Sequence, residues 1–487
     1  ELKALKKHSE FESSINRDAI SLFLRHNYIP CPYSIYKGIH KLKSGHILQL
    51  TASDLENESL PIENEYWSLA KIATDGVRNR WIGDEQSATD QFDKLLRKAT
   101  SLQMMADVPL GAFLSGGIDS STIVALMQSQ SLNPIKTFSI GFSEADFNEA
   151  IYAKKIASHL GTDHTELYVS PHEAMDVIPK LPQIYDEPFS DSSQIPTFLV
   201  AELAKKQVTV ALSGDAGDEL FCGYNRYHLS SLIWSKLELL PVRLRKLIAK
   251  LILSVSPSKW NSLLKKTPIS SKFANLGDKL HKGAAVMDAR NLEELYMYII
   301  SHCSNPTSIV LDSFESPTIL NGLRPNLKGL DDIEKMMVLD GLSYLPDDIL
   351  VKVDRATMAV SLESRIPFLD HRIVEFAWKL PKSFKYRDRT TKWILRQVLY
   401  KYIPPNLVER PKMGFGVPIG NWIKGPLKDW AEDLLSENGL KREGYFDYIV
   451  IRQMWDQHQA SKRNWQYQLW NILMFQSWLH ENQSNSQ

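Results

Sequence analysis

The stretch Leu114–Ser121, LSGGIDSS, decides how the rest of the chain is interpreted. It joins a compact apolar run, Val108–Leu114, to residues 119–130, whose apolar spacing is helical. Two glycines, Gly116 and Gly117, allow backbone N–H groups to approach an anion closely, and the start of a helix adds positive potential. The stretch therefore predicts a phosphate-binding loop, with further hydroxyl donors from Ser115, Ser120 and Ser121.

The loop has no lysine, whereas a Walker A loop requires Gly-Lys-Ser/Thr after its spacer. It therefore predicts a neutral cradle for phosphates. Asp119 would repel a phosphate directly, so its presence favours a bound Mg²⁺ that bridges the carboxylate to the phosphates. The alternative is an ordinary Gly-Gly turn in which Asp119 and the serines cap a helix. A strand before the loop and a helix after it favour the phosphate site.

The segments that follow the loop alternate between strand-like and helix-like patterns. Strands are predicted at Lys136–Phe142, His164–Val169 and Val208–Leu212, and a helix at Asn148–His159. This alternation predicts an α/β fold, a parallel sheet with helices on both faces, followed by a largely helical C-terminal part from about Leu229.

Two further regions have weaker patterns. Residues 1–50 predict a short helix, Arg17–His26, and a strand that ends in HILQL, while Thr51–Asn64 has the composition of a surface loop. The span Leu229–Lys265 is basic and amphipathic. Such helices either bury an apolar face in the core or lie on a membrane surface, and the first reading is favoured.

Composition limits the class of protein. The 487 residues include 57 Lys+Arg and 57 Asp+Glu, and this zero net charge argues against nucleic-acid binding through bulk positive charge. The three cysteines form no CxxC pair, so a reducing cytoplasm fits best. No apolar stretch is long enough for a membrane span or has the form of a signal peptide. We expect a cytoplasmic enzyme without nucleic-acid or membrane partners; its oligomeric state stays open, with a homodimer among the alternatives.

The loop resembles the pyrophosphate loop of the ATP pyrophosphatases, which have an adenine nucleotide α-hydrolase-like fold. The chain as a whole resembles the glutamine-hydrolysing asparagine synthetases, a class II amidotransferase joined to an ATP-pyrophosphatase synthetase domain. The matching segments occur in the order of that family: Asp186–Val200, Leu212–Tyr224, Leu345–His371, Thr390–Arg396 and Arg410–Trp422.

The resemblance implies a set of ATP contacts beyond the loop. Leu114 and Ile140, at the ends of the first two predicted strands, match positions that line the adenosine. Ser213 and Gly214 match positions that contact ATP. All four follow or end predicted strands, whose carboxyl ends form the ligand-binding edge of an open α/β sheet.

The resemblance also implies catalytic and metal-binding residues. Asp215 matches an acidic position, Glu in the best-known members, that forms and uses an acyl-adenylate; here the side chain is one methylene shorter. Asp218 is the expected second Mg²⁺ ligand beside Asp119, because acids packed near a triphosphate require a cation between them. Lys392, on a helix-like segment, matches the lysine that neutralises charge on the α-phosphate and the leaving pyrophosphate. A capped acidic turn and an ordinary surface lysine are the alternatives.

The reaction that the resemblance implies is ATP-dependent amidation of aspartate to asparagine. The substrate carboxylate attacks ATP·Mg²⁺ to give a β-aspartyl-adenylate and pyrophosphate, and ammonia then displaces AMP. ATP, aspartate and either glutamine or ammonia are the expected partners. Six charged residues either form structural ion pairs or bind the amino and carboxylate groups of the substrate amino acid, and both alternatives are kept: Asp347, Asp348, Asp354, Arg355, Glu363 and Arg365.

The N-terminal part resembles only the end of a glutaminase domain, whose nucleophile is an N-terminal cysteine. This chain has Glu1 there, and Cys31 in its Pro-rich turn lacks the free α-amine that would serve as base. We expect a piece of a longer enzyme, with residues 1–72 as the remnant of an α+β glutaminase (Ntn-type) domain and residues 85–480 as the synthetase domain. As written, the chain is expected to use ammonia and not glutamine.

Three alternatives remain at this point. The same chemistry can act on another carboxylate, such as a uronic acid in polysaccharide synthesis, or close a β-lactam ring. A different class is a nucleotide-binding module without catalysis. The joint presence of Asp119, Asp215, Asp218 and Lys392 argues against that class, because ATP binding alone does not need them.

Overall fold

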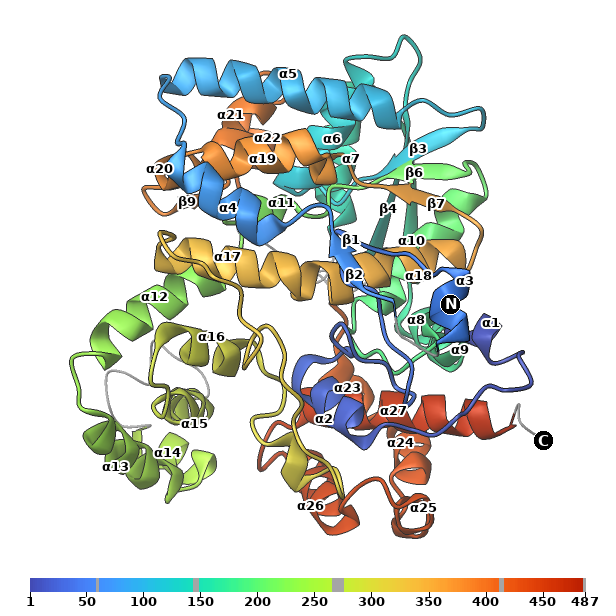
Figure 1. Cartoon of the computed structure of the whole chain (residues 1–487), viewed down its shortest axis with the longest axis vertical. Coiled ribbons are helices and arrows are strands. Elements are labelled where there is room, and N and C mark those ends of the chain that lie inside the picture. The colour runs from blue at the N-terminus through green and yellow to red at the C-terminus, as the bar shows by residue number, and fades with distance from the viewer. Residues whose placement is uncertain (58–60, 143–148, 265–275, 411–415, 485–487) are drawn as a thin grey trace.

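The sheet at the centre of the fold has five parallel strands in the order β5-β4-β3-β6-β7 (Figure 1). The computed structural model describes residues 1–57, 61–142, 149–264, 276–410 and 416–484. The strands are β3 (Leu110–Phe113), β4 (Lys136–Phe142), β5 (Asp163–Val169), β6 (Val210–Leu212) and β7 (Glu363–Arg365). The predicted α/β class with a parallel sheet is confirmed.

Helices cover both faces of this sheet. Successive side chains of a strand point to opposite faces, and in β6 Ala211 belongs to one hydrophobic core whereas Val210 and Leu212 belong to the other. The core of Val210 and Leu212 includes α5 (Glu85–Gln103), α6 (Ile118–Gln128), α7 (Ala150–Leu160), α19 (His371–Lys379) and α21 (Trp393–Leu399). The core of Ala211 includes α2 (Arg17–His26), α9 (Leu181–Tyr185), α10 (Gln194–Lys205), α26 (Tyr448–Gln459) and α27 (Gln466–Ser484).

The chain has further helices, namely α1 (Leu2–Leu5), α3 (Ala52–Glu56), α4 (Leu69–Arg78), α8 (Pro171–Met175), α11 (Gly217–Leu220), α12 (Asn225–Leu237), α13 (Val242–Leu253), α14 (Pro257–Leu264), α15 (Leu276–Val286), α16 (Leu292–Ile300), α17 (Asp332–Leu342), α18 (Val351–Met358), α20 (Lys382–Lys385), α22 (Pro405–Val408), α23 (Ile419–Trp422), α24 (Lys428–Leu434) and α25 (Glu437–Glu443). Of these, α4 and α17 also contribute to the core of Val210 and Leu212. Within the described ranges no helix combines the length and apolar character needed to cross a bilayer.

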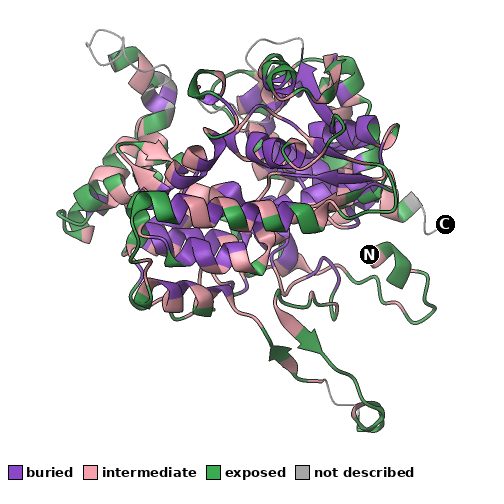
Figure 2. Cartoon of the chain, turned by 90° about the horizontal axis from the view of Figure 1, so that it is seen from above, coloured by how far each residue is buried: buried purple, intermediate pink, exposed green. Residues whose placement is uncertain are grey.

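The sequence did not predict the antiparallel pair of two-residue strands β8 (Tyr386–Arg387) and β9 (Thr390–Thr391), nor the three-residue strands β7 and β2 (Glu63–Glu65). β7, Glu-Ser-Arg, pairs in parallel with β6 at the edge of the sheet, in the region that was predicted to be mostly helical. The expected surface loop Thr51–Asn64 contains α3 and the start of β2, which pairs with β1 (His46–Leu48) in a projecting, largely exposed hairpin (Figure 2). β7 and β2 are short and polar, so they carry no apolar alternation that a sequence could show.

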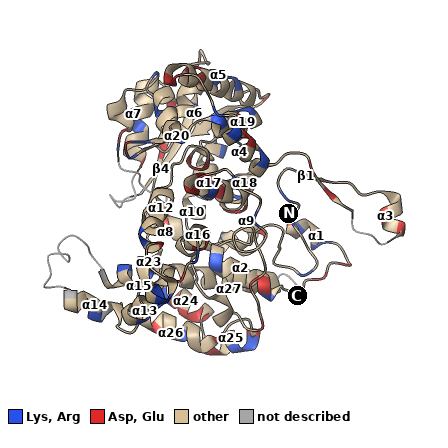
Figure 3. Cartoon of the chain, turned by 60° about the vertical axis from the view of Figure 1, so that its left-hand side comes forward, with Lys and Arg blue, Asp and Glu red and all other residues tan. Residues whose placement is uncertain are grey.

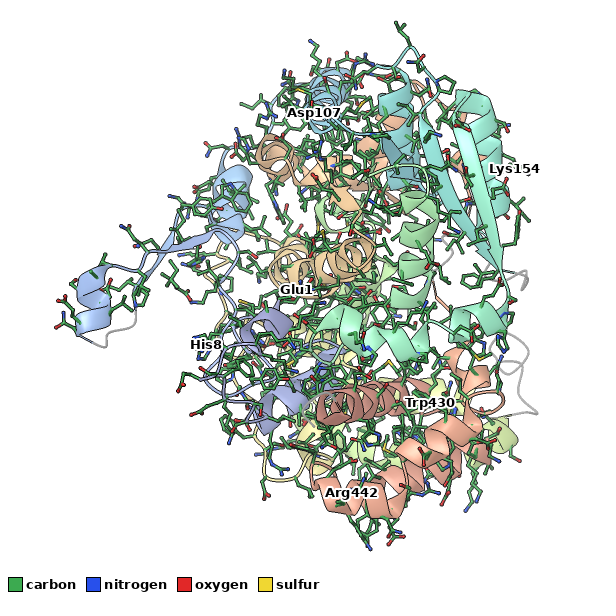
Figure 4. The ribbon with its side chains drawn as sticks, turned by 90° about the vertical axis from the view of Figure 1, so that its right-hand side faces the viewer. Glu1, His8, Asp107, Lys154, Trp430 and Arg442 are labelled. Carbon is green, nitrogen blue, oxygen red and sulfur yellow. The ribbon has the colours of Figure 1, made fainter. Side chains whose placement is uncertain are left out.

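The N-terminal segment packs into the larger fold. Ile20 and Phe23 of α2 are completely buried in the core that also contains α27. The side-chain amide of Asn471 on α27 donates to the Leu24 carbonyl at 3.1 Å. Glu1 lies beside the central helices, where its carboxylate pairs with Arg355 of α18 at 3.0 Å (Figure 4). Residues of this segment therefore share a core with the C-terminal helices; the division into 1–72 and 85–480 stays a prediction.

The basic helices after Leu229 agree only in part with the favoured prediction of a core-facing apolar side and a solvated Lys/Arg side. Three leucines of α13, Leu244, Leu247 and Leu251, are 43%, 55% and 61% exposed. The buried side chain of α13 is Arg245, whose guanidinium donates to the Ala289 carbonyl at 2.7 Å. On the same side of the helix as Arg245, Val242, Ile248, Ala249 and Ile252 are half-buried, whereas Arg243, Lys246 and Lys250 are exposed together with the three leucines. Figure 3 marks the Lys and Arg residues of this group of helices in blue.

Candidate functional site

The predicted phosphate loop connects β3 to α6 at the carboxyl edge of the sheet. Gly116 has φ +74°, and a Cβ there would lie 2.9 Å from the backbone nitrogen of Ala153 on α7, so both backbone shape and space require glycine. Gly117 is the N-cap of α6. The hydroxyls of Ser115 and Ser120 are 3.0 Å apart and close the loop on itself. Residues 115–120 thus present backbone N–H groups and hydroxyls at a helix N-terminus.

A cavity of about 720 Å³ opens above this loop. The segments after β3 and β6 meet at its floor, because a Cβ on Gly214 would lie within 2.7 Å of the Asp119 carbonyl carbon. The sequence-predicted residues that line the cavity are Leu114, Ser115, Gly116, Gly117, Asp119, Ser120, Ile140, Ser213, Gly214, Asp215, Asp218 and Lys392. Ser121 differs: it is completely buried in α6 and does not line the cavity.

Lys392 connects two of the predicted acids. Its Nζ contacts the Asp119 carboxylate and lies 2.7 Å from Oδ1 of Asp218. Burial alone would lower the pKa of Lys392, but the two carboxylates raise it above the ordinary lysine range. The residue is the N-cap of α21 with φ +57°, a left-handed conformation, and not part of the helix as its sequence context indicated.

The same two carboxylates fit the expected Mg²⁺. Asp119 and Asp218 come from the first turns of two helices, α6 and α11, and offer hard oxygen ligands to one region of the cavity. Mg²⁺ is commonly held by one or two carboxylates together with substrate phosphates. Across the described residues no group of three or more His, Cys, Asp or Glu side chains could hold a metal without such help. The donor set therefore fits a metal that arrives with a phosphate ligand.

Two further acids follow β6: Asp215, which is partly buried in the loop, and Glu219, which is buried in α11. The Ser213 hydroxyl donates to the Asp215 carboxylate, and the Ser213 Oγ in turn accepts from the Asp215 N–H at 3.1 Å. Burial raises the pKa of Asp215, and Ser213 and Lys352 partly oppose this shift. Burial, with the Asp218 charge nearby, raises the pKa of Glu219 to about 7. The Tyr224 hydroxyl donates to Glu219 at 2.6 Å.

Sequence reasoning missed four cations in the cavity wall: Arg389 and Arg396, and the two that contact other site segments, Lys352 and Arg410. Lys352 on α18 is 8% exposed and pairs with Asp191 at 2.9 Å, and its pKa is raised because Asp191 and Asp348 outweigh the effect of burial. Arg410 donates to the Ser115 carbonyl of the phosphate loop at 3.3 Å. Both lie in segments quoted for the family resemblance, so the resemblance was the available signal. Residues 411–415, within the segment Arg410–Trp422, lie outside the described residues.

The six charged residues that stayed open lie outside the cavity wall. Asp347 accepts from the Cys31 N–H at 2.9 Å and Asp348 from the Asn27 amide at 3.0 Å, so these two hold the N-terminal segment. The other four are Asp354, which is exposed, and the paired Arg355, Glu363 and Arg365. Their contacts favour structural roles over contact with a substrate.

Cys31 lies in this same network. Burial, together with Asp347, raises the pKa of its thiol to about 12. A thiol with a raised pKa stays protonated at neutral pH and is a poor nucleophile.

Comparison with known proteins agrees with this geometry. Residues 91–480 match the asparagine synthase family, and residues 1–67 match a glutamine amidotransferase domain. Glutamine-hydrolysing asparagine synthetase 1 of Bacillus subtilis is 30% identical over 476 residues, which cover 95% of this chain and 68% of that protein. A putative glutamine-hydrolysing asparagine synthetase of Mycobacterium bovis is 31% identical over 484 residues, with 96% and 68% covered. The amidase chyE of Penicillium rubens is 23% identical over 463 residues, with 86% and 64% covered.

Proposed function

Because this chain belongs to the asparagine synthase family of ATP-dependent, amide-forming ligases, we propose that it converts aspartate to asparagine through a β-aspartyl-adenylate. The observation that carries the proposal is the cavity in which the phosphate loop, Lys392 and Asp215 meet. A neutral cradle, a cation and a partly buried carboxyl group are the components that adenylation and the following aminolysis need.

The loop residues bind and orient the triphosphate. Ser115, Gly117 and Ser120 offer donors to phosphate oxygens, while Leu114 and Ile140 form apolar wall for the adenosine. Lys392 neutralises the negative charge that grows as pyrophosphate leaves the α-phosphorus. When bound by Asp119 and Asp218, Mg²⁺ supplies further charge neutralisation at the phosphates. ATP bound in this way displaces Lys392 from at least part of its contact with the two acids.

The acceptor is held on the other side of the cavity. Lys352 and Asp215 both line the cavity, and the Lys352 charge lowers the pKa of Asp215. The ammonium group of Lys352 suits the α-carboxylate of an amino acid. Asp215 suits the α-ammonium group or the proton that ammonia must lose after attack. Ammonia is the nucleophile in this proposal, because a neutral amine attacks the activated carbonyl while AMP leaves.

The test measures pyrophosphate release from ATP·Mg²⁺ with and without aspartate, with ammonia or glutamine as nitrogen source and asparagine assayed in parallel. The proposal expects aspartate-dependent pyrophosphate and stoichiometric asparagine with ammonia. Aspartate-independent background in every arm would reject aspartate as the acceptor. A further arm with a uronic acid then distinguishes another acceptor from a chain without ligase activity.

A further inference from the structure

A second cavity, of about 280 Å³, lies in the C-terminal helical region. Its walls come from α14, from α23 and the residues after it, and from the turn between α26 and α27. It shares no lining residue with the cavity above the phosphate loop. Its polar lining includes Lys424, His458, Lys462, Arg463, Asn464 and Gln466. Nothing in the ligase chemistry proposed above uses these residues.

His458 presents a buried donor to this cavity. The side chain is 1% exposed, and the backbone N–H of Trp465 donates to its Nδ1 at 3.2 Å. Burial, with the Lys424 charge adding to it, lowers the pKa of His458 to about 4, so the ring is neutral at pH 7. Because Nδ1 accepts a hydrogen bond, the neutral ring carries its proton on Nε2. The backbone carbonyls of Gly420 and Arg463 lie near the ring and partly oppose the lowering of its pKa, but among the described residues none meets hydrogen-bond geometry at this buried Nε2.

The charged residues described in the lining of this cavity are all basic. They are Lys424, Lys462 and Arg463, and none of the other described lining residues is acidic. The Lys424 Nζ lies 3.1 Å from the Ser461 hydroxyl, which keeps the ammonium group at the cavity. The 19-residue helix α27 starts at Gln466, so its N-terminal partial positive charge adds to the same region. A cation would be repelled here, and an apolar ligand would leave these donors unpaired.

We propose that this cavity binds a small phosphate-type anion, with His458 Nε2–H and the Lys424 and Lys462 ammonium groups as its donors. Three donors from α26, from the segment after α23 and from the α26–α27 turn approach from different directions, which suits the several oxygens of a phosphate group better than one carboxylate. The site is separate from ATP binding and independent of the acceptor that the ligase uses.

The test is isothermal titration calorimetry with inorganic pyrophosphate, without Mg²⁺ and at constant ionic strength. Two classes of site are expected, because the phosphate-loop cavity also binds pyrophosphate. Lys392→Ala weakens the class that belongs to that cavity. The double variant Lys424→Gln/Lys462→Gln weakens the other class about tenfold or more, because charge-assisted hydrogen bonds are lost. The control Lys94→Gln, on exposed α5 surface, leaves both classes unchanged.

A pair of variants at His458 isolates the buried donor. His458→Phe removes the N–H and should weaken the second class about tenfold, whereas His458→Gln, whose amide can replace the Nε2–H, should stay within about threefold. Unfolding midpoints without ligand identify any variant that fails to fold, and the lysine variant then decides alone. The proposal is overturned if the lysine double variant binds pyrophosphate at both classes of site with unchanged affinity. It is also overturned if sodium chloride, at equal ionic strength, weakens pyrophosphate binding at the second class as much as a competing phosphate-type anion would.

Discussion

The two cavities handle negative charge in different ways. The cavity above the phosphate loop contains two acids, Asp119 and Asp218, held by the buried Lys392, whereas the cavity at His458 has cations and neutral donors and no acid among its described lining residues. In the first cavity the two carboxylates outnumber the lysine between them, so a triphosphate must bring its own cation or displace that lysine. The second attracts an anion directly. A site that must release pyrophosphate needs acids that hold a metal ion beside its lysine, whereas a site that only binds an anion needs basic residues and neutral donors alone.

Lys392→Ala should have the largest effect on this comparison. It removes the cation between two partly buried carboxylates and the charge that assists pyrophosphate departure. We expect aspartate-dependent turnover to fall about 10³-fold and the free energy of unfolding to drop by about 3 kcal/mol. Steady-state pyrophosphate release and urea unfolding measure the two effects.

The matched control for this variant is Lys401→Ala. Lys401 pairs with Asp90 at 2.7 Å on the surface, where such pairs contribute less than about 1 kcal/mol. Equal losses for both lysines would mean that the position of Lys392 between the two acids has no special part in turnover.

Asp218→Asn should have the next largest effect, because it keeps the shape of the side chain while removing one of two carboxylates. We expect the apparent Mg²⁺ activation constant to rise about tenfold and kcat to fall about 10²-fold. The measurement is turnover across a Mg²⁺ titration at saturating ATP. An unchanged Mg²⁺ dependence would assign Asp218 to the ion pair with Lys392 alone.

Glu219→Gln tests the effect of the acids on stability. The pKa of Glu219 is about 7 in the folded chain against an ordinary 4.5, so the folded state binds the proton more tightly. Its contribution is therefore complete below pH 4.5 and is lost as the pH rises to about 7. A glutamine mimics the protonated form and does not titrate. Relative to wild type, the variant should gain up to about 3 kcal/mol between pH 4.5 and pH 8.

Urea unfolding of both proteins at pH 5 and pH 8 checks this prediction. The hydroxyl of Tyr224 can donate to the amide oxygen of a glutamine as it does to the Glu219 carboxylate, so the variant keeps that hydrogen bond. A difference in stability that is the same at both pH values would show that Glu219 does not titrate in this range.

The parts of the fold that the sequence predicted are those in which burial requires a continuous run of apolar or β-favouring residues. The strand Lys136–Phe142 was predicted with its observed bounds because its residues are almost all buried, which produces a continuous β-favouring run. β7 left no such run, because its three residues are polar and its place in the sheet depends on backbone pairing with β6. For α13, the amphipathic pattern was visible and its lysines are exposed, but the burial of Arg245 depends on its tertiary partner, the Ala289 carbonyl.

The site residues divide in the same way, into those that local sequence pattern predicts and those that depend on tertiary contacts. Residues directly after predicted strands, such as Ser115 and Ser213, could be assigned to one edge because parallel strands end together. Lys352 could not be assigned from pattern, since its pairing with Asp191 joins segments 161 residues apart. The left-handed backbone of Lys392 is likewise a tertiary effect: its N–H donates to the Phe221 carbonyl at 3.1 Å in the loop region after β6.

Ser121→Ala should have the smallest effect, and it separates loop donors that face the cavity from those that do not. The Ser121 hydroxyl is completely buried in α6 and has no hydrogen-bond partner in the described part of the chain. Its removal should change kcat/KM for ATP by less than about twofold, whereas Ser120→Ala, which removes a hydroxyl at the cavity, should lower it about tenfold. Pyrophosphate release at limiting ATP provides both values. Equal losses would mean that α6 shifts when ATP binds and brings Ser121 to the phosphates, since a hydroxyl that stays beneath the loop cannot reach them.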